Sequence, residues 1–199
     1  MRIAVFGGSG TIGSAAASRL TEAGHEVITA SRSGPHTVDT TDPDSVQALF
    51  EELGTVDAVV SAIGGGPFVA TPETTSEQVQ EGLAGKLAGQ MNLVIKGLPY
   101  VSDAGSFTLT SGILNAVPVR GGAIAAAING GLESFVHVAS HELPRDIRLN
   151  AISPTVLEES LDKYGPVFPG FQPTTGRQVA DAFLRSVAGL ENGEVIRIW

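Results

Sequence analysis

The sequence contains no cysteine, and this absence removes both disulfide bonds and thiolate metal sites. Histidine is scarce as well: none of the four residues, His25, His36, His137 and His141, has an HExxH-like spacing. His137 and His141 lie four residues apart on one predicted helix, and we expect both on the protein surface. The sequence therefore predicts no metal site.

Basic residues and long apolar runs are also few. Twelve lysines and arginines stand against 21 acidic residues, and the formal charge of -9 disfavours binding to nucleic acid or to anionic lipid. No apolar run approaches the roughly 20 residues that span a bilayer. In the opening segment MRIAVFGGSG, the apolar run before the first glycine is too short for the core of a signal peptide. We expect a soluble, cytoplasmic protein without nucleic-acid or membrane partners.

What the sequence does contain is a regular alternation of short β-branched runs with longer segments of helical period. This alternation is typical of the α/β class, and it predicts a single-domain Rossmann-type doubly wound parallel sheet, with helices on both faces, over residues 1–199. The expected strands are Arg2 to Phe6, Glu26 to Ala30, Asp57 to Ala62, Ser106 to Thr110, Arg148 to Ser153 and Val195 to Trp199.

Five helices are expected between the strands, each marked by an apolar stripe. The first should stop at Gly24, and the second runs from a cap at Asp42 to Gly54. The third ends near Pro99. The stripes are Ile12, Ala16 and Leu20; Val46, Leu49, Phe50 and Leu53; Val79, Leu83, Leu87, Met91, Val94 and Leu98; Ile124, Ile128, Leu132, Phe135, Ala139 and Leu143; and Val179, Ala180, Phe183, Leu184 and Val187.

One connection is unusually short. Seven steps lead from Arg32 to Asp39, about 23 Å at roughly 3.3 Å per extended residue, whereas a parallel crossover needs a dozen residues or more. Any strand between Thr37 and Asp39 must therefore be a short one at the sheet edge.

The segment GGSGTIG follows the first predicted strand and opens the first predicted helix. Its Gly7, Gly10 and Gly13 leave backbone amides bare at a helix N-terminus, where they suit a pyrophosphate. We therefore predict dinucleotide binding by this loop, with Ser9, Thr11 and Ile12 among the contacts. A merely tight turn is the alternative.

The second predicted strand ends in Ser31 and Arg32 rather than in an acid. A hydroxyl and a guanidinium accept a 2′-phosphate, so NADP(H) is favoured over NAD(H). Alternatively, Arg32 is a solvated surface residue. Asp39 is a candidate contact for the adenine amino group or, equally, a turn former.

Glycines also follow the central strand, in DAVVSAIGGG. Ala62 and Gly64, with the glycines after it, would let a ribose and a nicotinamide lie against the backbone. A flexible loop is the alternative.

Together these segments resemble the short-chain dehydrogenase/reductase superfamily almost from end to end. GGSGTIG is similar to its glycine motif, VDAVVSAIG to its strand-four Asn-Asn-Ala-Gly segment, and GSFTLTSG to the segment that ends in the catalytic serine. GGLESFVHVASHELPRDIRLNAISPTVL is similar to its helix, strand and Pro-Gly motif, with Thr155 at the glycine. The resemblance implies an oxidoreductase and adds Pro154 to the cofactor contacts.

The chain departs from the family at its catalytic motif. Aligned on Leu132 and Glu133, the Tyr-x-x-x-Lys motif falls on Ala125 and Asn129, so both catalytic residues are missing. A methyl group cannot transfer a proton, and a neutral amide cannot replace the lysine charge.

Three residues are candidates for the missing chemistry. Lys86, at the position of a family asparagine, should project into the crevice, and Ser111 could hydrogen-bond a carbonyl. Tyr164 lies in the probable substrate-side lid, residues 156–173, and is a possible proton donor. The alternatives are a surface lysine, a strand-end cap and lid packing, respectively.

Three functions remain open. The first is an NADP(H)-binding oxidoreductase with a rearranged site, acting on an unidentified small carbonyl or alcohol. The second is a non-catalytic NADP(H) sensor, and the third a scaffold that retains only the fold.

The resemblance also implies a homodimer or homotetramer, since family members pair two helices across a two-fold interface. Small residues that would allow this approach are Gly82, Ala84, Gly85, Ala88, Gly89, Ala126, Ala127, Gly130 and Gly131. Alternatively, they pack within the chain.

Overall fold

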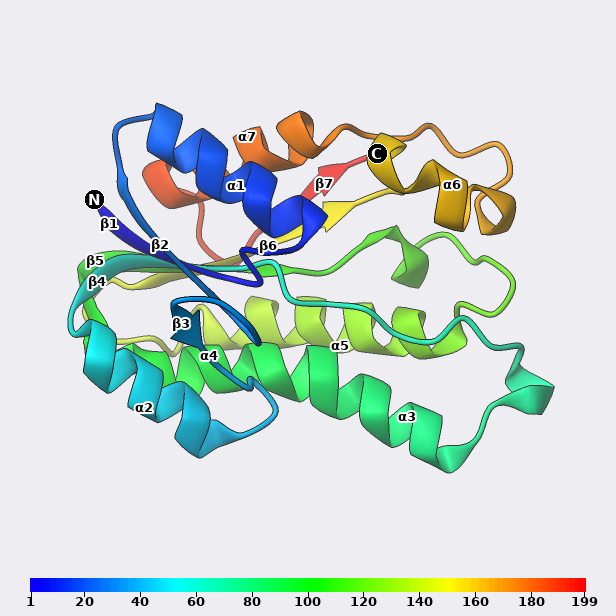
Figure 1. The fold of residues 1–199 in the computed structure, drawn as a ribbon, viewed down its shortest axis with the longest axis horizontal. Helices are drawn as coiled ribbons and strands as arrows, with labels where there is room; N and C mark the ends of the chain where they lie inside the picture. The colour runs from blue at the N-terminus through cyan, green and yellow to red at the C-terminus, as the bar shows by residue number, and fades with distance from the viewer.

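The computed structural model describes all 199 residues and contains one parallel sheet of seven strands in the order β3-β2-β1-β4-β5-β6-β7. Figure 1 shows α1 and α7 on one face of this sheet and α2, α4 and α5 on the other. The predicted doubly wound fold is therefore confirmed. The strands are β1 (Arg2–Phe6), β2 (Glu26–Ser31), β3 (His36–Thr37), β4 (Val56–Ser61), β5 (Val101–Thr110), β6 (Arg148–Pro154) and β7 (Val195–Ile198). The helices are α1 (Thr11–Glu22), α2 (Pro43–Leu53), α3 (Ser76–Gly82), α4 (Gly89–Gly97), α5 (Ala123–Ala139), α6 (Leu161–Tyr164) and α7 (Gly176–Ala188).

Alternate residues of the strands enter two separate apolar cores. Ile3 and Val5 of β1 pack with Leu20 of α1 and Phe183 of α7, whereas Phe6 packs with the core beneath α2, α4 and α5. This division arises because successive side chains of a strand point to opposite faces. None of the helices combines the length and apolar character needed to cross a bilayer.

The ends of helices α1 and α2 follow the signals predicted from the sequence. Asp42 caps α2 by accepting from the Asp44 amide at 3.0 Å, and Pro43 occupies the first turn. Gly24 and Gly54 have φ values of 86° and 67°, which glycine adopts without steric cost. The short connection after Arg32 contains only the two-residue edge strand β3, which lies one residue earlier than expected.

The third predicted helix differs from the expected regular helix. It is divided into α3, a π-helical turn at Leu83–Ala88, and α4. The predicted apolar stripe of this helix is wrong at Met91. The fully buried residues in this part of the helix are Gln90 and Leu93. Gln90 occupies a core position because its amide pairs with the backbone N–H and C=O of Thr110, at 2.8 and 2.9 Å.

Two boundaries were also predicted wrongly. Helix α5 ends at Ala139, so Leu143 lies beyond it. Strand β5 begins at Val101 rather than at Ser106, because Val56 pairs with Val101 while Ala58 pairs with Ser106, and the residues between them bulge.

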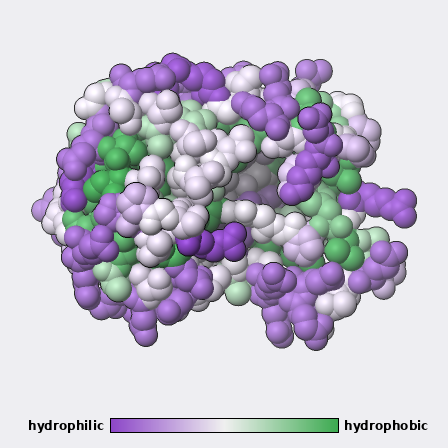
Figure 2. Space-filling view, viewed as in Figure 1, coloured by the Kyte–Doolittle hydropathy of each residue, from purple (hydrophilic) through white to green (hydrophobic).

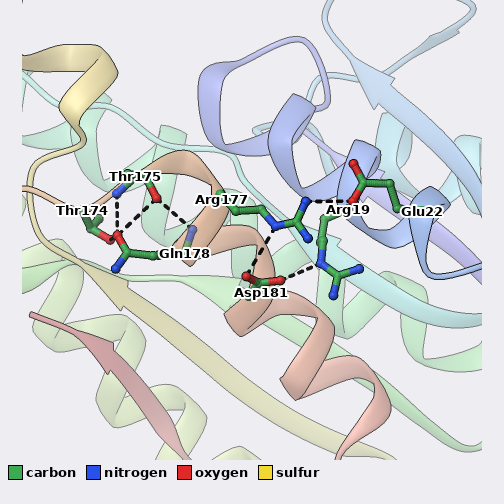
Figure 3. Close-up of polar contacts among 7 residues, drawn as sticks. All are labelled: Arg19, Glu22, Thr174, Thr175, Arg177, Gln178 and Asp181. Carbon is green, nitrogen blue, oxygen red and sulfur yellow. Dashed lines mark hydrogen bonds and ion pairs between the residues drawn. The ribbon is translucent and has the colours of Figure 1, made fainter.

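Helices α1 and α7 are aligned by a surface network of ion pairs (Figure 3). Asp181 binds Arg19 at 2.6 Å and Arg177 at 3.5 Å, and Arg177 also reaches Glu22 at 2.8 Å. Thr175 and Gln178 form a reciprocal capping box at the start of α7. Exposed pairs contribute little energy individually, so we assign the network to helix alignment.

Of the small residues proposed for an oligomer interface, some pack within the chain and others are exposed. A Cβ on Gly82 would lie 2.9 Å from Ile124, and one on Gly131 would lie 3.1 Å from Leu87, so these two glycines bring α3 and the π turn against α5 within the chain. Ala84, Ala88 and Ala127 are exposed. Pairing across a two-fold axis stays a prediction for the exposed residues.

Two glycines on the third helical segment give a matched test of packing. A Cβ on Gly97 would lie 2.6 Å from the Phe50 ring and 3.2 Å from Phe107, whereas one on Gly85 would meet nothing within 4 Å. We expect Gly97→Ala to lower the free energy of unfolding by about 1–3 kcal/mol through overpacking. Gly85→Ala should raise it by up to about 1 kcal/mol through helix propensity. Urea denaturation of both variants would check this, and an equal effect at the two positions would contradict the packing described.

Candidate active site

A cavity of about 340 Å³ lies at the carboxyl ends of β4, β5 and β6. Lys86, Ser111 and Tyr164, which come from three distant parts of the sequence, all line it. Figure 1 places α3 and α6 at this end of the molecule, and Figure 2 shows the surface hollowed right of centre, between the two layers. The structure thus brings the three predicted catalytic candidates to one site.

Lys86 is held by two neutral oxygen atoms. Its Nζ donates to the backbone carbonyl of Ser111 and to Oδ1 of Asn129, both at 2.9 Å. The Asn129 amide in turn donates to the carbonyl of Gly112 at 2.9 Å, which fixes its orientation. Lys86 and Asn129, which the sequence places on different helices, are therefore direct hydrogen-bond partners.

Burial lowers the pKa of Lys86 from its ordinary 10.5 to about 8. No carboxylate lies within ion-pair distance of its ammonium, so no opposite charge offsets this desolvation. The amine and ammonium forms are consequently both accessible near neutral pH, which is the property required of a proton-transfer group.

The hydroxyl of Ser111 donates to Glu133 Oε1 at 2.6 Å. Glu133 also accepts from Asn115 Nδ2 at 2.8 Å, and its side chain is only 14% exposed. Ser111 is therefore oriented by a carboxylate, and its oxygen lone pairs remain available to accept a hydrogen bond. Donation from Ser111 to a substrate would require it to leave Glu133.

Tyr164 belongs to an aromatic group over the cavity. Its ring centroid lies 5.7 Å from that of Phe68, and Phe68 lies 6.2 Å from Phe168. A bridge between Leu157 and Thr174 closes the base of the segment that carries Tyr164. The contact of the Tyr164 ring with Phe68 agrees with a packing role in the lid. Because Tyr164 also lines the cavity, its role as a proton donor stays a prediction.

The glycine loop has the geometry of an anion site. A Cβ on Gly13 would lie 2.0 Å from the Gly7 carbonyl, and one on Gly7 would lie 2.7 Å from that of Ala62, so neither position admits a side chain. Gly10 provides no side-chain cap for α1, and the amides of Thr11, Ile12 and Gly13 have no acceptor within the protein. These open amides fit a dinucleotide pyrophosphate.

Other predicted cofactor contacts are distributed along the same edge of the sheet. Ala62, Gly64 and Pro154 line the cavity. Arg32 is exposed and free of any ion pair, while the hydroxyl of Ser31 donates to the carbonyl of Ser33. Ser9 is exposed at the loop.

Asp39 serves as a turn former. Its Oδ1 accepts from the hydroxyl of Thr41 at 2.7 Å and from the Thr41 amide at 2.9 Å. These bonds hold the pKa of the Asp39 carboxyl below its ordinary value. An adenine contact at this residue would have to use the remaining oxygen.

Glu133 was missed as a site residue because its sequence position identified it only as part of the helix. The available signal was spacing, since it lies one helical turn after Asn129 and eight residues after Ala125, both of which line the cavity. Nothing in the local sequence indicated that Ser111 would be its partner.

The pKa of Lys86 can be tested by adding a charge beside it. Asn129→Asp would place a carboxylate at the position of the amide, and we expect the Lys86 pKa to rise by about 1–3 units. Titration of the Lys86 side-chain ¹³Cε and ¹⁵Nζ signals by NMR on uniformly labelled protein, assigned with Lys86→Arg, measures this directly. Ala127→Asp adds the same charge on the exposed face of α5 and should leave the pKa nearly unchanged. An unperturbed Lys86 pKa in the wild-type protein would refute the assigned burial.

Comparisons with known proteins agree with this architecture. The family model described as enoyl-(acyl carrier protein) reductase matches residues 8–188. The crystal structure of the protein lin1944 from Listeria innocua is 47% identical, with a TM-score of 0.97 and complete coverage of both chains. A small-chain dehydrogenase crystallised in complex with NADPH is 27% identical, with a TM-score of 0.90 over 100% of this chain and 96% of the other.

More distant similarity concerns the fold alone. A short chain dehydrogenase from Mycobacterium smegmatis is 20% identical with a TM-score of 0.86, over 99% of this chain and 91% of the other. A comparison with proteins of curated function finds no match. The extent of the family match, together with the sheet order and the glycine loop, shows that the chain belongs to the short-chain dehydrogenase/reductase superfamily, whose members are usually oxidoreductases.

Proposed function

We propose that this protein is an NADP(H)-dependent oxidoreductase that interconverts a small carbonyl compound and its alcohol, with Lys86 as the proton-transfer group. The observation that carries the proposal is the position of the Lys86 ammonium, which lines the cavity and is held by two neutral acceptors. The cavity volume of about 340 Å³ suits a small molecule.

The cofactor is proposed to lie along the carboxyl edge of the sheet. Its pyrophosphate would occupy the glycine loop, with contacts from Gly7, Ser9, Gly10, Thr11, Ile12 and Gly13. Its 2′-phosphate would meet Ser31 and Arg32, its adenine Asp39, and its nicotinamide Ala62, Gly64 and Pro154. A related protein crystallised with NADPH supports this assignment. When bound, the cofactor supplies or accepts the hydride.

Lys86 has the geometry of a general acid. Two of its N–H bonds are directed at Ser111 and Asn129, and the third remains for the oxygen of a bound carbonyl. In the reducing direction the ammonium donates a proton to that oxygen, and in the oxidising direction the neutral amine accepts one. Once the proton has been transferred in the reducing direction, Ser111, oriented by Glu133, accepts a hydrogen bond from the new hydroxyl of the product.

This arrangement would compensate for the departure from the family motif. Ala125 and Asn129 stand where the family has its catalytic tyrosine and lysine, and both line the cavity. We infer that the two residue types have exchanged positions. The family has its lysine on α5 and an asparagine at the π turn, whereas this chain has Asn129 on α5 and Lys86 at the π turn. Tyr164 is a second proposed proton donor, placed at the lid side of the cavity.

A non-catalytic NADP(H) sensor is the second candidate function. It is favoured by the methyl group of Ala125 at the tyrosine position, together with the engagement of the Ser111 hydroxyl by Glu133. In this case nucleotide binding would occur without turnover of any carbonyl compound.

Cofactor preference is tested by calorimetry on protein freed of nucleotide. We expect NADPH to bind more tightly than NADH by at least about tenfold, because the Arg32 guanidinium pairs with the 2′-phosphate. Arg32→Ala should remove this preference, and Arg185→Ala, at an exposed position on α7, should retain it. Absence of heat from either nucleotide would reject both candidate functions.

Turnover is tested with a panel of small aliphatic and aromatic aldehydes and ketones, followed by NADPH absorbance. Lys86→Met should lower kcat/KM by about 10²–10⁴-fold, the usual contribution of general acid catalysis. Lys96→Met is the matched control, since Lys96 donates to Gln47 away from the cavity.

The pH dependence has a defined sign. Reduction requires the ammonium and should fall as the pH rises through about 8, the pKa of Lys86, while alcohol oxidation should rise over the same range. Unchanged rates in Lys86→Met would contradict the assigned role, and turnover of no compound in the panel by the wild type would favour the sensor.

A further inference from the structure

A second cavity, of about 690 Å³, adjoins the first at the side of the lid. Phe68 lines both cavities, so they share part of a wall. The Val69 amide donates to the carbonyl of Gly121 at 3.1 Å, which ties the loop carrying Phe68 to the loop carrying Arg120. The two cavities are therefore neighbouring compartments with a shared wall.

The walls of the outer compartment are mainly apolar. Phe171 and Val167 of the lid line it, together with Val119 and Pro118 of the loop that carries Arg120. Phe171 lies 5.2 Å from Phe168, a residue of the inner cavity, so the aromatic lining continues from one compartment to the other. This continuity suits an apolar ligand body longer than the inner cavity alone accommodates.

The two compartments taken together have a net charge opposite in sign to that of the whole chain, and the outer one has one basic and one acidic residue. Among the residues that line them, the charged ones are Lys86 and Arg120, with Glu73 as the one carboxylate. The chain as a whole has 12 basic and 21 acidic residues. Arg120 is exposed and has no carboxylate within ion-pair distance, so its guanidinium remains available.

We propose that the outer compartment binds the acidic end of the substrate, which is a monoanion with an apolar body. The body lies along Phe68 and the lid aromatics, and the carboxylate, or an equivalent oxyanion, pairs with Arg120. The assignment of the other end, an oxo or hydroxyl group at Lys86, rests on the function proposed above. Arg120 is thus a specificity-determining residue, and Glu73 at the same cavity selects against more highly charged anions.

A matched pair of fluorescent probes tests the outer compartment without any turnover. 1-Anilinonaphthalene-8-sulfonate is an apolar monoanion, and N-phenyl-1-naphthylamine has the same ring system without the charge. Both are titrated into the NADP⁺-saturated protein. We expect Arg120→Gln to weaken the anionic probe about tenfold and to change the neutral one less than about twofold, because a charge-assisted hydrogen bond is lost.

Three further variants complete the design. Glu73→Gln should strengthen binding of the anionic probe, because it removes a repulsive charge. Arg185→Gln is the matched control, since it changes the same charge at an exposed position outside both cavities and should alter neither affinity. Phe68→Ala should weaken both probes by removing the shared aromatic wall.

The inference is overturned if Arg120→Gln leaves the anionic probe unaffected, or if Arg120→Gln and Arg185→Gln weaken it equally. Weaker binding of the anion in Glu73→Gln would also overturn it, because Glu73 would then support the anion rather than repel it. These outcomes are distinct from failure of the proposed function, which is a lack of nucleotide binding by calorimetry or a lack of turnover in the absorbance assay. Probe titration without NADP⁺ keeps the outer compartment testable in that event.

Discussion

The contact of the Lys86 ammonium with two neutral oxygens joins three elements at one point: the π turn, the end of β5 and the middle of α5. Because neither partner carries a charge, the desolvation of the ammonium is only partly offset, and the lowered pKa follows. The same contact sets the orientation of Asn129 and, through it, of the Gly112 carbonyl. The position of the site and its acid–base property therefore have one cause.

Much of the architecture follows from local sequence signals. Asp42 and Pro43 start α2, Gly54 ends it, and the alternation of β-branched runs with helical segments predicts a parallel sheet. The prediction failed where tertiary contacts override periodicity. Gln90 is buried because it pairs with the β5 backbone, and a polar residue gives no sign of that partner in the sequence.

The sequence allowed several residues of the site to be predicted, but not the hydrogen bonds between them. Lys86 and Asn129 were each identified by position, yet their hydrogen bond depends on helix packing that glycines at 82 and 131 allow. The stripe Val79, Leu83, Leu87 repeats every four residues, as does the stripe Ile12, Ala16, Leu20 of the regular helix α1, so the spacing does not distinguish the π turn from an α-helix. Glu133 needed the structure, because its partner Ser111 lies on another element.

The π turn also makes the site sensitive to the number of residues in this segment of the chain. Each residue of an α-helix rotates the next by about 100°, so a wide turn contains the rotational equivalent of one inserted residue. A one-residue insertion or deletion in this segment would change which side chain enters the cavity without altering any catalytic codon. The geometry of Lys86 thus depends on the number of residues in this segment as much as on the residue type at position 86.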